Sequence, residues 1–153
     1  MSPVAQIPDI PVAPDHFEVT TEDVVLVAEL RSSLAICVHD AVEEAGALLH
    51  LRCIVRGNKP ADVTDTTLAT ELLLLDRCLQ SLHEAAPSAR ALQARIIGHL
   101  DDHPYARTSC ESVVSLVQQY LTDAGFRVLP VDLTAGAPRQ LRFRPGMGWL
   151  QSR

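Results

Sequence analysis

Ser33 and His50 are the two residues of this sequence best suited by type and position to nucleophilic chemistry. A histidine that takes the proton of a serine hydroxyl lets the oxygen attack a carbonyl carbon, which is the first step of acyl transfer and amide hydrolysis. Such a pair usually needs a third member that orients the histidine. Two interpretations stay open: a working serine–histidine hydrolase, or a retired site whose side chains serve packing and hydrogen bonding.

The other residues with reactive side chains favour structural roles. Cys37 follows Ser33 by four positions and is expected to be a core thiol, while Cys53 is expected to face away from the side of its strand that carries His50. The four cysteines contain no CxxC pair and match neither a zinc ribbon nor a disulfide framework. The segment HLDDH, residues 99–103, has ligand-like types, but its setting favours a solvated loop. We therefore expect no metal and no cofactor.

Composition and charge narrow the class of protein. The 153 residues suffice for one domain, and a hydrophobic share of 47% with a charged share of 21% is ordinary for a soluble protein. The first basic residue is Arg31 and no apolar run could span a bilayer, so we expect a cytoplasmic protein without membrane insertion. The net charge of −6 and 4% aromatic residues argue against nucleic-acid binding. Nothing indicates an oligomer, so we expect a monomer.

The negative charge lies at the start of the chain. The first 30 residues carry six acidic side chains and no basic one. Within this region residues 1–16 hold four prolines and no periodicity, which predicts a flexible, solvated leader before a single domain at 17–153. Near the other end, Arg142 and Arg144 alternate with apolar residues, which predicts a strand with one wet face.

Hydrophobic patterning predicts an α+β domain with a mixed sheet and two main helices on one face. Thr108 and Glu111 have the spacing of a capping box at the start of the second helix, and Gly125 marks its end. A loop is predicted at 56–60 and a turn at 145–148. The predicted helices cover 64–85 and 108–124, and the predicted strands cover 17–20, 23–30, 34–39, 46–55, 91–100, 126–133, 139–144 and 148–152.

The stretch SSLAICVHDAVEEAGALLH has five residues at the spacing of a known signature, namely Ser32, Cys37, Asp40, Gly46 and His50. It resembles the signature of the chemoreceptor glutamine deamidase family, CheD, which reads Gly-Ser-Cys-Val-Ala-Val-Cys-Leu-Tyr-Asp and then Gly-Gly-Met-Asn-His. The likeness continues through ALQARIIG, SCESV and GFRVLPVDLTAGAPRQLRF, and it spans roughly residues 24–151. These later segments keep Glu111, Asp132, Arg139 and Phe143 in register.

The resemblance implies a three-layer α/β/β sandwich and a chemotaxis function. Family members hydrolyse the side-chain amide of receptor glutamines to glutamate and release ammonia, and they bind chemoreceptors and a CheC-type phosphatase. Their site uses a cysteine thiolate paired with a histidine, together with an upstream threonine. By this resemblance Ser33 and His50 hold the catalytic positions, and Arg31 and Ser32 line the site.

Several positions depart from the family pattern. Ser33 replaces the nucleophilic cysteine, and a serine hydroxyl needs a better-oriented base than a thiol does. The expected threonine is absent, since Ala28 and Val27 stand there. Arg31 replaces a glycine, and Thr134–Ala135 replaces a later glycine pair. We therefore favour a catalytically impaired CheD-like protein that binds a chemoreceptor or a CheC-type phosphatase; the alternative is an active protein-glutamine deamidase that uses Ser33 and His50.

Overall fold

The computed structural model describes residues 6–40, 42–52 and 66–153, ordered as ten strands, two α-helices and one short 3₁₀ helix. Cys53, the end of the strand predicted to reach residue 55 and the loop predicted at 56–60 lie outside the described residues. Within the described part, neither helix is long and apolar enough to cross a membrane. The elements are β1 Asp9–Pro11, β2 His16–Thr20, β3 Val25–Leu30, β4 Ser33–Asp40, β5 Ala45–Arg52, α1 Thr66–Ala85, β6 Gln93–His99, α2 Ala106–Asp123, β7 Arg127–Val128, β8 Asp132–Thr134, β9 Arg139–Arg144, η1 Pro145–Met147 and β10 Trp149–Ser152.

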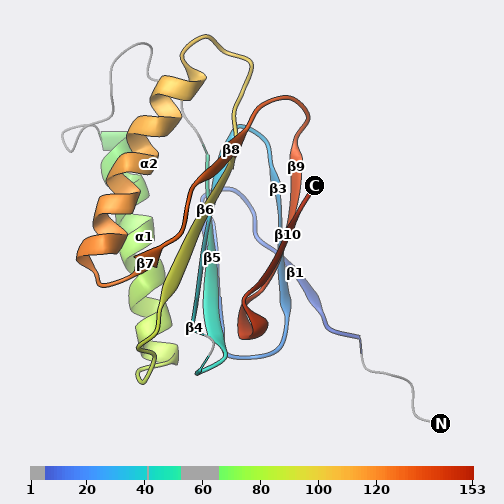
Figure 1. Cartoon of the computed structure of the whole chain (residues 1–153), viewed down its shortest axis with the longest axis vertical. Coiled ribbons are helices and arrows are strands. Elements are labelled where there is room, and N and C mark those ends of the chain that lie inside the picture. The colour runs from blue at the N-terminus through green and yellow to red at the C-terminus, as the bar shows by residue number, and fades with distance from the viewer. Residues whose placement is uncertain (1–5, 41, 53–65) are drawn as a thin grey trace.

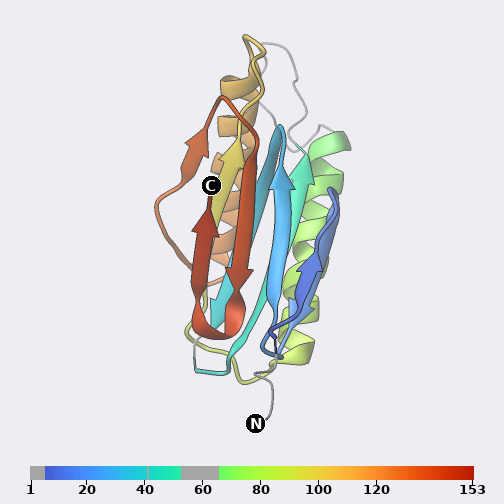
Figure 2. The same cartoon turned by 90° about the vertical axis from the view of Figure 1, so that its right-hand side faces the viewer.

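Two sheets and one layer of helices form a three-layer α/β/β sandwich, as Figures 1 and 2 show. The larger sheet has the order β2-β5-β4-β6-β7, and β8 also pairs with β6. The smaller sheet has the order β1-β3-β9-β10 and covers one face of the larger sheet, while α1 and α2 cover the other (Figure 1). Parallel and antiparallel pairs occur in both sheets. The predicted α+β class, mixed sheet and two helices on one face are thus confirmed.

The central strands are buried on both faces because each face meets another layer. All eight residues of β4 are buried, which explains why this strand reads as a nearly continuous apolar run. Its even-numbered residues Leu34, Ile36 and Val38 pack in the core under the helices. Ala35 and Cys37 instead join the core between the two sheets. Ser33 is odd-numbered, like Ala35 and Cys37, so its side chain lies on the face of β4 that is toward the smaller sheet.

The second helix differs from the prediction at its start and agrees at its end. It begins at Ala106 after Tyr105, with no side-chain cap, so Thr108 already lies inside the first turn and the predicted capping box is wrong. Glu111 instead accepts a hydrogen bond from Arg107, one turn earlier. At the other end Gly125 has φ +89°, and the last carbonyls of the helix accept the N–H groups of residues 125 and 126.

The acidic start of the chain is bound to the domain by arginines. Asp9 forms a two-pronged ion pair with Arg142, Asp23 forms one with Arg144, and Asp15 pairs with Arg52. The alternation of Arg142 and Arg144 with buried residues is confirmed. The flexible, solvated leader predicted for residues 1–16 is corrected over its second half, because β1 pairs in parallel with β3 and the residue after β1 is buried.

Candidate functional site

Adjacent strands bring Ser33 and His50 together. Ser33 is the first residue of β4, and His50 lies on the antiparallel neighbour β5, opposite Ala35. The Ser33 hydroxyl donates a hydrogen bond to His50 Nε2 over 2.9 Å, as required for transfer of its proton to the ring. Each residue is only 1% exposed. The structure therefore places the two predicted catalytic residues in direct contact, but inside the protein.

A backbone carbonyl fixes the proton on His50. The Nδ1 atom lies 2.9 Å from the carbonyl oxygen of Val12, and because a carbonyl only accepts, Nδ1 carries the hydrogen. In the neutral ring Nε2 is then free to accept from Ser33. Burial lowers the pKa of His50 below its ordinary value, and the opposing effects of the Val12 carbonyl and Asp15 do not reverse the shift. The result is a neutral imidazole in the tautomer that a general base for Ser33 needs.

A pocket of about 540 Å³ reaches the histidine of this pair. One side of it is formed by residues 11–14, and the other side includes residues 27–29 of β3. His50 and Arg31 belong to its wall, whereas Ser33 does not. The pocket therefore ends at the His50 ring, which is itself only 1% exposed, and the Ser33 hydroxyl lies away from the pocket wall.

Arg31 and Ser32 form the short turn that leads into the candidate nucleophile. Ser32 has φ +45°, and its backbone N–H donates to Nδ1 of His99 over 2.9 Å. The other ring nitrogen of His99 donates to the carbonyl of Gly136 over 2.8 Å. Arg31 is exposed and pairs with Glu29 of the preceding strand. Arg31 thus lies at the pocket, and the backbone N–H of Ser32 is hydrogen-bonded to a histidine; the site-lining role expected of both residues stays a prediction.

The aspartate of the signature has a structural role. Both carboxylate oxygens of Asp40 are saturated by backbone N–H groups: Val42 and Glu43 donate to Oδ1, and Arg90 and Ala91 donate to Oδ2. Burial acts to raise the pKa of Asp40, but the four hydrogen bonds together outweigh it and hold the pKa below its usual value. Asp40 therefore ties the turn after β4 to the segment after α1.

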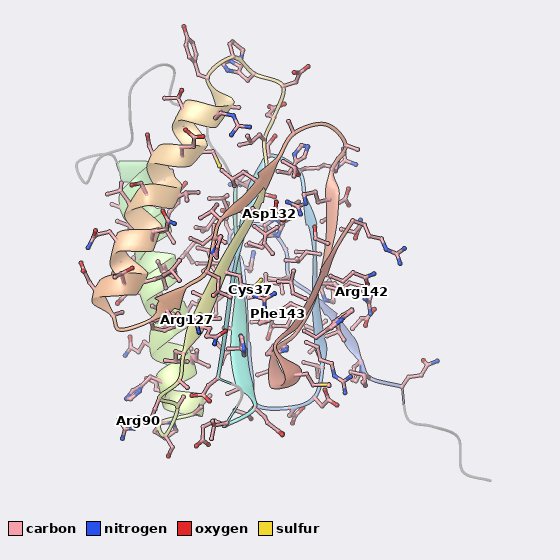
Figure 3. The ribbon with its side chains drawn as sticks, in the orientation of Figure 1. Cys37, Arg90, Arg127, Asp132, Arg142 and Phe143 are labelled. Atoms are coloured by element: carbon pink, nitrogen blue, oxygen red, sulfur yellow. The ribbon has the colours of Figure 1, made fainter. Side chains whose placement is uncertain are left out.

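Cys37 and Gly46 of the signature are also explained by packing. Cys37 and Phe143 lie between the two sheets (Figure 3), and burial raises the pKa of the Cys37 thiol, which excludes a ready thiolate. A Cβ atom on Gly46 would lie 2.5 Å from the Val38 carbonyl oxygen and 2.5 Å from Pro145 Cβ. Only glycine fits at position 46 without displacing a neighbour.

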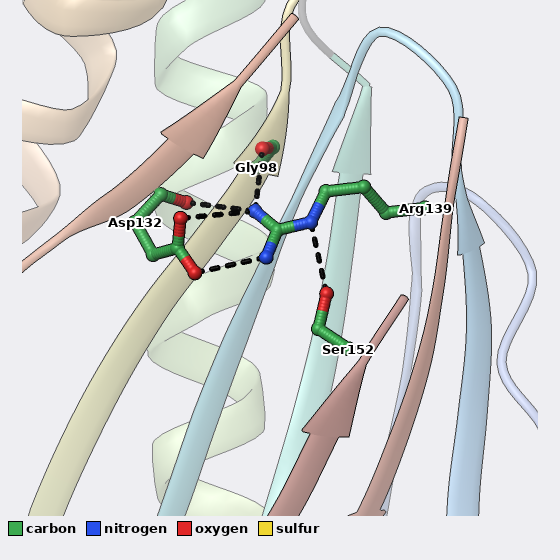
Figure 4. A network of polar contacts seen from close by, with 4 residues as sticks. All are labelled: Gly98, Asp132, Arg139 and Ser152. Atoms are coloured by element: carbon green, nitrogen blue, oxygen red, sulfur yellow. Dashed lines mark hydrogen bonds and ion pairs between the residues drawn. The ribbon is translucent and has the colours of Figure 1, made fainter. Parts of the chain in front are cut away.

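Asp132 and Arg139, kept in register in the sequence, form an ion pair that joins the two sheets (Figure 4). Arg139 extends from β9 and donates from both terminal nitrogens to the Asp132 carboxylate of β8. It also donates to the Ser152 hydroxyl and to the Gly98 carbonyl. This pair lowers the pKa of Asp132 and fixes the smaller sheet against the edge of the larger one.

Sequence reasoning did not identify Val12 or His99 as neighbours of the site. Val12 acts through its carbonyl, which every residue possesses, so no side-chain type could indicate it. His99 was visible in the segment HLDDH, but its residue types suggest only a metal ligand or a loop residue. Among the described residues, no group of three or more His, Cys, Asp or Glu side chains is arranged to hold a metal ion.

The chain is also similar in sequence to known proteins over most of its length. No protein-family model matches the chain. It is 25% identical over 137 residues to the "Probable chemoreceptor glutamine deamidase CheD 1" of Burkholderia thailandensis, a match that covers 88% of this chain and 58% of the relative. Relatives named "Probable chemoreceptor glutamine deamidase CheD" in Burkholderia mallei and Burkholderia pseudomallei match to the same extent. The chain thus spans a little more than half the length of the curated relatives it matches, and the similarity supports placing it with CheD-like proteins.

Proposed function

We propose that this chain is a cytoplasmic CheD-like chemotaxis protein that binds a chemoreceptor and is silent as a deamidase in the closed arrangement of its site. The observation that carries the second half of the proposal is the burial of Ser33 and His50, each 1% exposed. Both ring nitrogens of His50 are already hydrogen-bonded, one to Ser33 and one to Val12. A glutamine side chain has no path to the Ser33 oxygen while these contacts last.

The chemistry of the amide supports the same conclusion. Attack requires the nucleophile within about 3–3.5 Å of the amide carbon, in a geometry that substrate binding must enforce. A serine hydroxyl also depends more on its base than a thiol does. Ala28 and Val27, at the positions of the family threonine, offer no hydroxyl to the site. Among the described residues, the Val12 carbonyl is the one partner of the His50 ring besides Ser33, and it belongs to the segment that covers the pair.

Docking does not require the reaction. Affinity between proteins comes mainly from a few buried anchors, so a binding surface can persist after a nucleophile is lost. The names of the similar proteins make a chemoreceptor the first partner to test. A CheC-type phosphatase is the second partner to test, and we expect the protein to be a monomer before it binds either.

A second function, protein-glutamine deamidation, is favoured by the 2.9 Å bond between Ser33 and a neutral His50. In that reaction Ser33 Oγ bonds to the amide carbon, and its proton passes to His50 Nε2. The imidazolium then protonates the nitrogen of the tetrahedral adduct, the C–N bond breaks, and ammonia departs and leaves an acyl ester on Ser33. Water, deprotonated by His50, hydrolyses the ester to glutamate and restores Ser33.

One experiment separates the two functions. Purified receptor signalling domain with its glutamines intact is incubated with wild type, Ser33→Ala, Ser33→Cys and His50→Ala. Complex formation, ammonia release and the amide-to-acid mass change are measured on the same samples. Receptor binding without ammonia supports the docking protein. Ammonia release that disappears in Ser33→Ala and His50→Ala would replace it with the serine-based deamidase, and failure to bind any receptor tested would contradict both.

A further inference from the structure

We propose that residues 8–16, here called the N-terminal strap, form a displaceable cover that closes the Ser33–His50 pair to molecules from solution. This inference concerns access to the pair, so it goes beyond the proposed function and needs no receptor to be true. The strap contains β1 and the residues that lead into β2. It runs along the outer edge of β3 (Figure 2).

The strap touches the histidine directly and is anchored beside it. The Val12 carbonyl accepts from His50 Nδ1, and the Asp15 N–H donates to the His50 carbonyl over 2.6 Å. The Val12 N–H donates to the carbonyl of Val27 on β3 over 2.8 Å. The Val12 side chain, 4% exposed, belongs to the core between the sheets. The strap therefore occupies one ring nitrogen of His50 and packs against the histidine from the side of residues 12–15.

Several features make this cover easy to displace. Its strand β1 has three residues and lies at the edge of the smaller sheet. Pro8, Pro11 and Pro14 have no N–H to donate, which limits the backbone hydrogen bonds that the strap can form. Its two ends are held by the exposed ion pairs Asp9–Arg142 and Asp15–Arg52. Exposed ion pairs stabilise weakly and are screened by salt.

Displacement of the strap would open the pair without dismantling it. Ser33 and His50 belong to β4 and β5, the most extensively paired strands of the larger sheet, so their mutual hydrogen bond does not depend on the strap. The pocket wall formed by residues 11–14 would move away with the strap. His50 Nδ1 would exchange the Val12 carbonyl for water. The open form would thus present an intact serine–histidine pair to solvent.

Carbethoxylation of histidine by diethyl pyrocarbonate measures this opening. An unprotonated ring nitrogen of His50 bonds to a carbonyl carbon of the reagent, the C–O bond to the ethyl carbonate leaving group breaks, and the ring proton passes to solvent. Peptide mass mapping gives the rate at His50, and exposed His83 serves as an internal reference for the reagent. The buried Cys78 of α1, probed with a maleimide, reports whether the whole fold has opened.

Two arginines of β9 provide a matched pair of variants. Arg142→Gln removes the ion pair to the strap, and Arg144→Gln removes a similar two-pronged ion pair to Asp23, which lies outside the strap. We expect slow labelling of His50 in wild type, about two- to fivefold faster labelling in Arg142→Gln, and no change in Arg144→Gln. Asp9→Asn should repeat the effect of Arg142→Gln, so the result does not depend on one variant.

The outcomes decide the proposal. Faster His50 labelling in Arg142→Gln and Asp9→Asn, with Cys78 still protected, supports a cover that opens by itself. Labelling of wild-type His50 as fast as His83 would overturn it, because the pair would not be closed. Equal rates in all variants would overturn it as well, since the ion pairs would not hold the strap. Joint exposure of His50 and Cys78 would show that the strap opens only when the whole protein unfolds, and this result would also overturn the proposal.

Discussion

Mild acid should destabilise the folded protein through two buried histidines whose pKa is lowered, His39 and His50. His39 is 7% exposed, lies on β4 and packs edge-on against the Phe143 ring. Burial lowers the pKa of His39, the Arg95 charge acts in the same direction, and Asp40 only partly opposes them. The pKa of His50 is lowered for the same first reason. Protonation of either ring therefore places a positive charge where water cannot solvate it.

The direction and size of the effect follow from proton linkage. In the unfolded chain both histidines take up a proton near pH 6.5, but the folded protein keeps them neutral to lower pH. The unfolded state thus binds more protons below about pH 6.5, so this stability is fully present above that pH and is lost as the pH falls through the folded-state values. Each histidine contributes at most about 1.4 kcal/mol per pH unit, or about 2.7 kcal/mol for both. That slope is large against a typical domain stability of about 5–15 kcal/mol.

Urea unfolding followed by far-UV circular dichroism, repeated from about pH 8 to about pH 5 at constant ionic strength, measures this slope. His39→Gln and His50→Gln should each remove about half of it, and His83→Gln, on an exposed face of α1, serves as the matched control. Carboxylates whose pKa is lowered, such as Asp40, lose their contribution only below about pH 4, outside this window. A slope unchanged by both buried-site substitutions, or stability that rises on acidification, would refute the reasoning.

Three further substitutions test the packing and the site. Gly46→Ala should reduce the free energy of unfolding by about 1–3 kcal/mol, because the added methyl group meets other atoms at 2.5 Å. Gly125→Ala adds its methyl group in open space, so it should reduce the free energy of unfolding by only about 1–2 kcal/mol, which comes from the backbone φ of +89°. Thermal denaturation of the two proteins side by side checks that order. Arg139→Lys keeps the charge but loses the planar fork between the sheets, so we expect a loss of about 1–3 kcal/mol in urea unfolding; a change near zero would show that the fork is dispensable. Ser33→Ala leaves buried His50 Nε2 without a donor and should cost about 1–3 kcal/mol; a more stable Ser33→Ala protein would mean that the hydrogen bond is strained.

Much of the fold could be predicted because apolar periodicity is local. The strand predicted at 139–144 has the bounds observed for β9, and the helix predicted at 64–85 agrees with α1 over the described residues and ends at the same residue. The strand predicted at 126–133 is instead two short strands, β7 and β8, separated at residues 129–131. Pro130 lies in this interruption and has no N–H for a sheet ladder. The second helix begins two residues early, which shows that a capping pattern can recur inside a helix.

The contacts that close the site could not be predicted in the same way. Asp9 and Arg142 are 133 residues apart, and the acidic, proline-rich start of the chain predicted a solvated leader rather than one bound to the domain. The observed pairing needs the parallel register of β1 with β3 and the position of β9 beside β3. The Val12 carbonyl has no sequence signal at all. The resemblance could therefore name Ser33 and His50, but not what surrounds them.

The serine at position 33 is better suited to a closed pair than a cysteine would be. A hydroxyl is a strong donor to a neutral imidazole, whereas a thiol is a weak one, so serine satisfies buried His50 more completely. Burial also raises the pKa of thiols here, as it does for Cys37, and a cysteine held as a thiol at position 33 would not be reactive. The persistence of His50 then needs no catalysis to explain it, because a buried hydrogen bond between β4 and β5 is reason enough. Amide hydrolysis would depend both on the residue at position 33 and on the N-terminal strap. A better nucleophile at position 33 would raise the rate little while the strap, through Val12, stays bound to His50 and keeps substrate away from the pair.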